Sequence, residues 1–161
     1  MDLSAPSGPA AAPDPATGTE ATLWRDALSP ELRTLTEITL AYALEAVVAN
    51  GTPMLPFTVT ESDPAPGSTH APERVLHRFE GDLGAAVEKA RAHAHASGGP
   101  RAAVAWDGWL TVSGIRQDAV VVQASERGAP GVVVAHRYRE TLEGVVVVGK
   151  PVLVGPGDPV L

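Results

Sequence analysis

Five side chains that could take part in acid–base catalysis or bind a small ligand lie at or near the ends of predicted strands: His77, Asp118, Glu126, His136 and Tyr138. A histidine beside a carboxylate can form an acid–base pair or bind a metal ion. Side chains alternate along a strand, and this alternation assigns all five to the more apolar face of the predicted sheet, at the margin of the core. They define one candidate site, a pocket between the helices and the sheet.

The alternative interpretation of this group is structural. Polar groups at the margin of a core need hydrogen-bond partners, and each of the five residues could be solvated or satisfied separately. A one-residue bulge would also move a residue to the other face and dissolve the group. The pocket hypothesis predicts that the five side chains converge around a cavity and that at least one of them has a shifted pKa.

A second set of side chains shares the opposite, more polar face of the predicted sheet: Arg78, Trp109, Arg127, Arg137 and Arg139. Charged residues on the open face of a two-layer fold can be ordinary solvent cover. Arginine with exposed tryptophan is, however, the composition of binding hot spots, and an arginine patch would stand out in the field of an acidic protein. An acidic protein segment, a phosphate group or RNA could dock there, although RNA would need further aromatic residues for stacking.

Other catalytic and ligand-binding patterns are missing from the sequence. His93 and His95 are two positions apart on a predicted helix, so they do not share a face as a ligand pair would. The sequence contains no HExxH, phosphate-binding glycine loop, dinucleotide fingerprint, GxSxG or SxxK motif. It has no cysteine, which removes thiol catalysis and thiolate metal sites and fits a reducing compartment. We therefore expect no catalytic residue, no metal ion and no cofactor.

The composition narrows the class of protein further. The chain has 161 residues, 44% of them hydrophobic, which fits one globular domain. Its net charge is −7, and no Lys/Arg cluster is dense enough to neutralise several phosphates, which argues against a general nucleic-acid binder. The longest mostly apolar run, residues 40–49, contains Glu45 and is too short to span a membrane. Without a secretion signal, we expect a soluble cytoplasmic protein with no membrane partner.

The chain divides into two parts. Residues 1–22 are rich in Ala, Pro and Gly without apolar periodicity, which predicts a disordered tail, and residues 23–161 are predicted to form a single α+β domain. The first helix should begin after Ser29 and end before Gly51, two residues with the usual capping preferences. From Ile38 onward this helix is apolar nearly all round. That pattern predicts burial on more than one side, by the rest of the chain or by a second copy, and so permits a homodimer.

The remaining elements are a second helix and a series of strands. The second helix should follow Asp82 and end at the Gly98-Gly99-Pro100 sequence. Asp107-Gly108 is a strong signal for a two-residue hairpin turn. The order is α-β-β-α-β-β-β-β, with strands expected at residues 54–62, 73–79, 101–106, 109–113, 119–126 and 132–138, followed by a last short strand within 144–154. It favours a two-layer α+β fold with a mostly antiparallel sheet of about six strands and two helices on one face.

The favoured hypothesis for the function is therefore non-enzymatic. We expect a small protein-binding or adaptor domain of the chaperone-like or immunity-type class. Its binding surface would be the polar face that carries the four arginines and Trp109, which we call the Arg/Trp surface, and its partner would be another protein, possible partners including an acidic one. The alternative is a small-ligand-binding protein or enzyme that uses the His/Asp/Glu/Tyr pocket.

Overall fold

The computed structural model describes residues 24–161, so the predicted tail lies outside the described residues. Two helices, α2 (Pro30–Asn50) and α3 (Leu83–Ala96), accompany seven strands. The strands are β1 (Phe57–Glu61), β2 (Arg74–Arg78), β3 (Arg101–Val112), β4 (Ile115–Glu126), β5 (Gly131–Thr141), β6 (Gly144–Val147) and β7 (Val152–Gly157).

Capping residues fix both ends of α2. The Ser29 hydroxyl accepts a hydrogen bond from Leu32 N at 3.1 Å, and Pro30 occupies the first turn, where its missing N–H costs nothing. Gly51 ends the helix with a φ of 79° and donates its N–H to Val47 O at 3.0 Å. The predicted bounds of this helix are confirmed. Within the described part of the chain, no helix is both long enough and apolar enough to cross a membrane.

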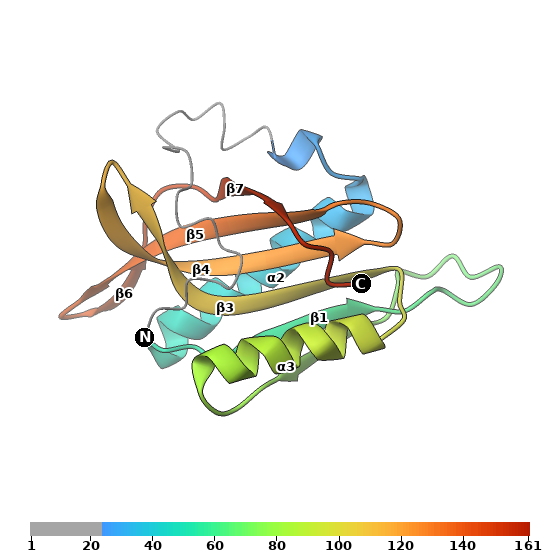
Figure 1. The fold of residues 1–161 in the computed structure, drawn as a ribbon, viewed down its shortest axis with the longest axis horizontal. Helices are drawn as coiled ribbons and strands as arrows, with labels where there is room; N and C mark the ends of the chain where they lie inside the picture. The colour runs from blue at the N-terminus through green and yellow to red at the C-terminus, as the bar shows by residue number, and fades with distance from the viewer. Residues whose placement is uncertain (1–23) are drawn as a thin grey trace.

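The strands form one curled antiparallel sheet in the order β2-β1-β3-β4-β5-β6, with β7 paired to β5 (Figure 1). β3 and β4 are joined by the turn Ser113-Gly114, whose two residues have φ values of 50° and 77°. The predicted hairpin turn at Asp107-Gly108 is wrong, because both residues pair with β4 in the middle of β3. The predicted strands 101–106 and 109–113 are consequently one strand.

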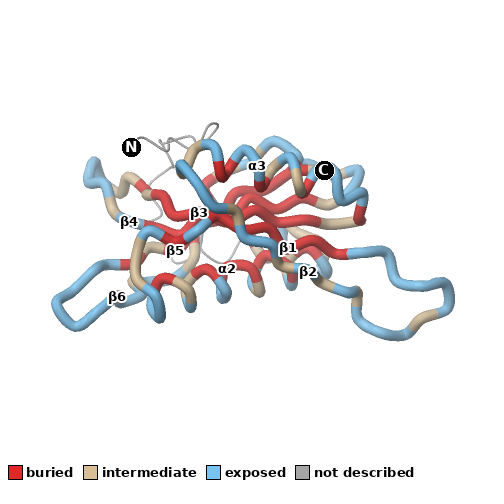
Figure 2. The backbone as a smooth tube through the Cα atoms, turned by 90° about the horizontal axis from the view of Figure 1, so that it is seen from below, coloured by how far each residue is buried: buried red, intermediate tan, exposed pale blue. Residues whose placement is uncertain are grey.

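The two helices lie on opposite faces of the sheet (Figure 2). α2 packs on a face that includes Val59, Ala105 and Val122, which we call the α2 face. α3 packs on the other side over Val104 and Trp106, on what we call the α3 face. The α+β class and the antiparallel sheet are confirmed, but the helices differ from the expectation of one shared face. The physical reason is that runs such as residues 119–124 are buried without interruption, which is typical of strands covered on both sides.

Candidate functional site

The residues of the predicted Arg/Trp surface are spread over the sheet. Arg78 lies on edge strand β2, and three strands separate it from β5, which carries Arg137 and Arg139. Arg127 follows the last residue of β4, where its guanidinium donates to Gly98 O at 2.5 Å. Trp109 lies near the turn between β3 and β4. The five residues therefore do not form one continuous surface.

The face expected to be open is covered by other parts of the chain. The buried side chain of Gln123 donates to Asp158 O at 2.6 Å. The buried hydroxyl of Ser125 accepts from Val160 N at 3.0 Å. The C-terminal segment therefore lies over β4, and α3 covers the neighbouring part of the same face. This leaves little of the sheet face itself free to hold a partner.

A cavity of about 460 Å³ lies between α3 and the C-terminal segment, lined by Arg91, His95 and Gln123 among other residues. The guanidinium of Arg91 has partners within the protein: its Nε donates to Gln123 Oε1 at 3.1 Å, and its Nη1 donates to Glu88 at 2.8 Å. The guanidinium also lies 5.2 Å from the ring centroid of Trp106. The lining of this cavity includes none of the five predicted pocket residues.

Four of the five predicted pocket residues, Glu126 among them, lie on the α2 face of the sheet, and three of these four lie near one another. Asp118, His136 and Tyr138 belong to the α2 face, on adjacent strands β4 and β5. Glu126 lies near the far end of β4, where it accepts from Arg101 Nη1 at 3.1 Å. His77 lies on edge strand β2, and its ring is stacked on His93 of α3 with centroids 4.8 Å apart. The predicted group is thus only partly brought together.

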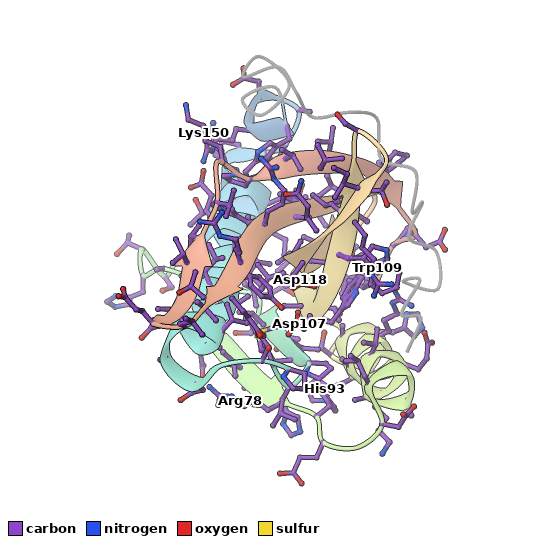
Figure 3. All side chains as sticks on the ribbon, turned by 90° about the vertical axis from the view of Figure 1, so that its left-hand side faces the viewer. Arg78, His93, Asp107, Trp109, Asp118 and Lys150 are labelled. Carbon is purple, nitrogen blue, oxygen red and sulfur yellow. The ribbon has the colours of Figure 1, made fainter. Side chains whose placement is uncertain are left out.

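Asp107 is the centre of this polar cluster, and the sequence did not single it out. It is 7% exposed, accepts from the Tyr138 hydroxyl at 2.5 Å and accepts from Met54 N at 3.1 Å. Burial raises the pKa of Asp107 against the opposing effect of these two hydrogen bonds, and the negative charges of Asp118 and Glu140 raise it further. Figure 3 shows Asp107 and Asp118 close together at this end of the molecule.

Tyr138 completes the anchor by donating its hydroxyl to Asp107. Burial, followed by the hydrogen bond to Asp107, raises the pKa of its phenol far above the usual range, so the hydroxyl stays protonated and donates. Asp107 in turn fixes Met54 and with it the segment 51–55 that connects α2 to β1. The hydrogen bonds of Asp107 and Tyr138 therefore position this loop.

His136 fixes a second loop in the same way. Its Nε2 donates to Gly149 O at 3.0 Å, because a carbonyl oxygen only accepts. Burial lowers the pKa of His136 from 6.5 against the raising effect of this hydrogen bond, and the positive charge of Arg137 lowers it further. The folded protein therefore favours the neutral form of the ring more than the unfolded chain does.

This lowered pKa predicts a pH-dependent stability. Because the unfolded chain takes up the proton first, acidification below about pH 6.5 should reduce the free energy of unfolding, by up to about 1.4 kcal/mol per pH unit for this one group. His136→Gln should retain a donor for Gly149 and flatten this slope. Urea unfolding at pH 7.5 and 5.5 measures the effect, with exposed His70→Gln as the matched control. Equal slopes in wild type and His136→Gln would contradict it.

The segment anchored by Asp107 forms one wall of a surface groove. We call this groove the α2 groove and define it by five of its lining residues, Tyr42, Ala46, Leu55, Leu76 and Arg78. Its volume is about 190 Å³, and its remaining lining includes the buried side chains of Met54 and Phe57. The groove thus has a buried apolar floor that α2, the 51–55 segment and edge strand β2 surround.

Large apolar side chains around the α2 groove are open to solvent. Tyr42 is 45% exposed and Leu55 42%. Val48, which is also on α2 but does not line the groove, is 50% exposed. The sequence predicted burial on more than one side of this helix. In the structure the sheet covers one side, and the outer side of the C-terminal half remains exposed. Contiguous exposed apolar surface with polar surroundings marks a site of interaction.

Arg78 provides the charge at the edge of the α2 groove. Within residues 24–161, its guanidinium has neither a hydrogen-bond nor an ion-pair partner. Arg74, two residues earlier on the same strand, contrasts with it by pairing with Glu61 at 2.9 Å. The edge of the groove therefore presents an unpaired guanidinium beside apolar side chains.

Comparisons with known proteins identify no relative for this chain: no family model, no curated protein and no solved structure matches it.

Proposed function

We propose that the chain is a protein-binding domain whose α2 groove receives an apolar side chain of its partner. The observation that carries this proposal is the pair of large exposed apolar side chains that line the groove, Tyr42 and Leu55. The absence of cysteine is compatible with a reducing environment, and we expect the interaction to take place in the cytoplasm.

The dimensions of the α2 groove favour a side chain of a protein over a free small molecule. Small-molecule sites usually measure about 300–1,000 Å³, and this groove measures about 190 Å³. Protein interfaces combine an apolar centre with a polar rim, and their hot spots are enriched in tyrosine and arginine. Tyr42 and Arg78 supply these two residue types at the groove.

Arg78 defines the chemistry of the partner. A guanidinium pairs with a carboxylate through two parallel hydrogen bonds, and its weak hydration lowers the cost of desolvation at an interface. The chain has a net charge of −7, so an acidic partner would meet repulsion over most of the surface and attraction at this edge. We therefore propose a partner segment in which an acidic residue adjoins a large apolar one.

A displayed library of random dodecapeptides, selected on the full chain, tests this proposal. The selected peptides should share an apolar residue next to Asp or Glu. Tyr42→Ala and Arg78→Glu should each weaken their binding about tenfold or more, because one removes apolar contact and the other places like charges together. Fluorescence anisotropy with one labelled peptide measures the affinities.

Arg139→Glu is the matched control, since Arg139 is exposed and belongs to the Arg/Trp surface predicted first. It should leave peptide binding unchanged. Peptides that bind Tyr42→Ala and Arg78→Glu as tightly as wild type, but lose affinity for Arg139→Glu, would overturn the assignment to the α2 groove.

A further inference from the structure

The two edge strands of the sheet differ in how well they are protected against pairing with a strand of another molecule. Edge strands expose unpaired backbone N–H and C=O groups, and natural proteins usually place charges there to prevent pairing with another strand. β2 follows this rule with Arg74 and Arg78. β6 does not, because it consists of Gly144 followed by valines. Figure 1 shows the β5–β6 hairpin extending from one end of the sheet.

The outer edge of β6 offers both apolar side chains and free backbone groups. Val146 is 46% exposed and Val147 39%. Val148 N donates to Arg137 O at 3.0 Å, which places Val148 on the side that bonds to β5. Bonding alternates along an antiparallel strand, so the N–H and C=O groups of Val145 and Val147 point away from β5. In the described sheet, β6 is the last strand of the order.

We propose that β6 pairs antiparallel with β6 of a second copy of this chain, about a two-fold axis at Val146. In this register Val145 of one copy faces Val147 of the other, so the outward backbone groups of both copies bond to each other. Two-fold interfaces use the same surface on both subunits. The inference rests on β6 alone and does not depend on the α2 groove.

The charges that flank β6 favour a second copy as the occupant. Glu143 precedes the strand and Lys150 follows it shortly after, with only Gly and Val between them. Antiparallel self-pairing brings Glu143 of each copy to the end where Lys150 of the other lies. Opposite charges therefore meet at both ends of the paired strands, and the uncharged valines meet in the middle.

A cysteine reporter tests this register directly, because the chain has no cysteine of its own. Val146 of the two copies would form a non-hydrogen-bonded pair with Cα atoms about 4.5 Å apart, a distance that a disulfide spans. Val146→Cys should therefore cross-link under mild oxidation. Val75→Cys, on the opposite edge strand and 51% exposed, is the matched control and should remain uncross-linked. Equal cross-linking of the two variants would overturn the proposal.

Sedimentation of the cysteine-free protein provides the second readout. Wild type should sediment as a dimer. Val147→Pro should shift it to monomer, since proline removes an outward N–H that the bonds to β5 do not use. Glu143→Lys or Lys150→Glu alone should weaken the dimer about three- to tenfold by placing like charges together, and the double exchange should restore it. A monomeric wild type, or a dimer insensitive to Val147→Pro, would overturn the proposal.

Discussion

Asp107→Ala should lower the free energy of unfolding by about 2–6 kcal/mol and abolish peptide binding at the α2 groove. Asp107 is 7% exposed and accepts from Tyr138 and from Met54 N. Alanine leaves both donors buried without a partner, at a cost of about 1–3 kcal/mol each. It also releases Met54, so the 51–55 wall of the groove loses its anchor. Urea unfolding and peptide anisotropy measure the two effects.

Asp107→Asn removes the charge and keeps one acceptor oxygen, which can serve Met54 N while the amide nitrogen donates to the Tyr138 oxygen. The raised pKa of Asp107 means that the folded protein holds this proton to a higher pH than the unfolded chain, whose pKa is about 3.8. The contribution of Asp107 to stability therefore falls as the pH rises from about 3.8 through the folded pKa. The neutral amide of Asp107→Asn removes this pH dependence. The free energy of unfolding of the variant should therefore fall furthest below that of wild type at acidic pH. Wild-type stability in Asp107→Ala would contradict the anchoring role.

Glu61→Ala should destabilise the fold by about 1–3 kcal/mol, because it leaves the partly buried guanidinium of Arg74 without its counter-charge and Arg101 with Glu126 alone. Glu61 is 2% exposed, and its carboxylate lies 2.6 Å from Arg101 Nε and 2.9 Å from Arg74 Nε. Arg101 also pairs with Glu126 of β4 at 3.1 Å. The network thus joins β1 to β2, β3 and β4, and its loss should loosen the strands that support the groove.

Thermal unfolding measures this effect, with Glu88→Ala as the control. Glu88 pairs with Arg91 at 2.8 Å, but its side chain is 62% exposed. Removal of such an exposed pair should cost less than about 1 kcal/mol. A Glu61→Ala loss as small as that of Glu88→Ala would show that the buried network does not hold the sheet together.

Features that depend on neighbouring residues could be predicted from the sequence. Ser29, Pro30 and Gly51 act within one turn of the helix ends, so the bounds of α2 follow from local capping preferences. The position of the turn between β3 and β4 does not follow from local preferences, because Asp107-Gly108 and Ser113-Gly114 are both good turn sequences. Pairing with β4 across a non-local register decides between them.

The faces of the sheet could not be assigned by alternation alone. Alternation marks strands with one buried face, whereas residues 119–124 and 131–135 are buried on both sides. The second cover comes from α3 and the C-terminal segment, which are distant in sequence from the strands they cover. This is why the predicted Arg/Trp surface is divided in the structure.

The candidate site was visible in the sequence only in part. The run of apolar residues around α2 from Ile38 onward predicted burial on more than one side, and in the structure Tyr42 and Val48 of this helix are exposed. Asp107 is the single acidic residue within the apolar run 102–110, and this pattern is itself an indication of a buried polar group. The contribution of Arg78 depends on its position beside Leu55 and Leu76, which only the β1–β2 pairing establishes.

A charge exchange between Arg78 and the partner tests the protein-binding function most directly. One selected peptide is made in two forms, with its acidic residue intact or replaced by lysine, and each form is titrated onto wild type and Arg78→Glu. We predict that the lysine peptide binds wild type about tenfold more weakly and regains its affinity on Arg78→Glu, because the swap restores opposite charges. Arg78→Glu binding the original peptide as tightly as wild type, with no gain for the lysine form, would contradict the account.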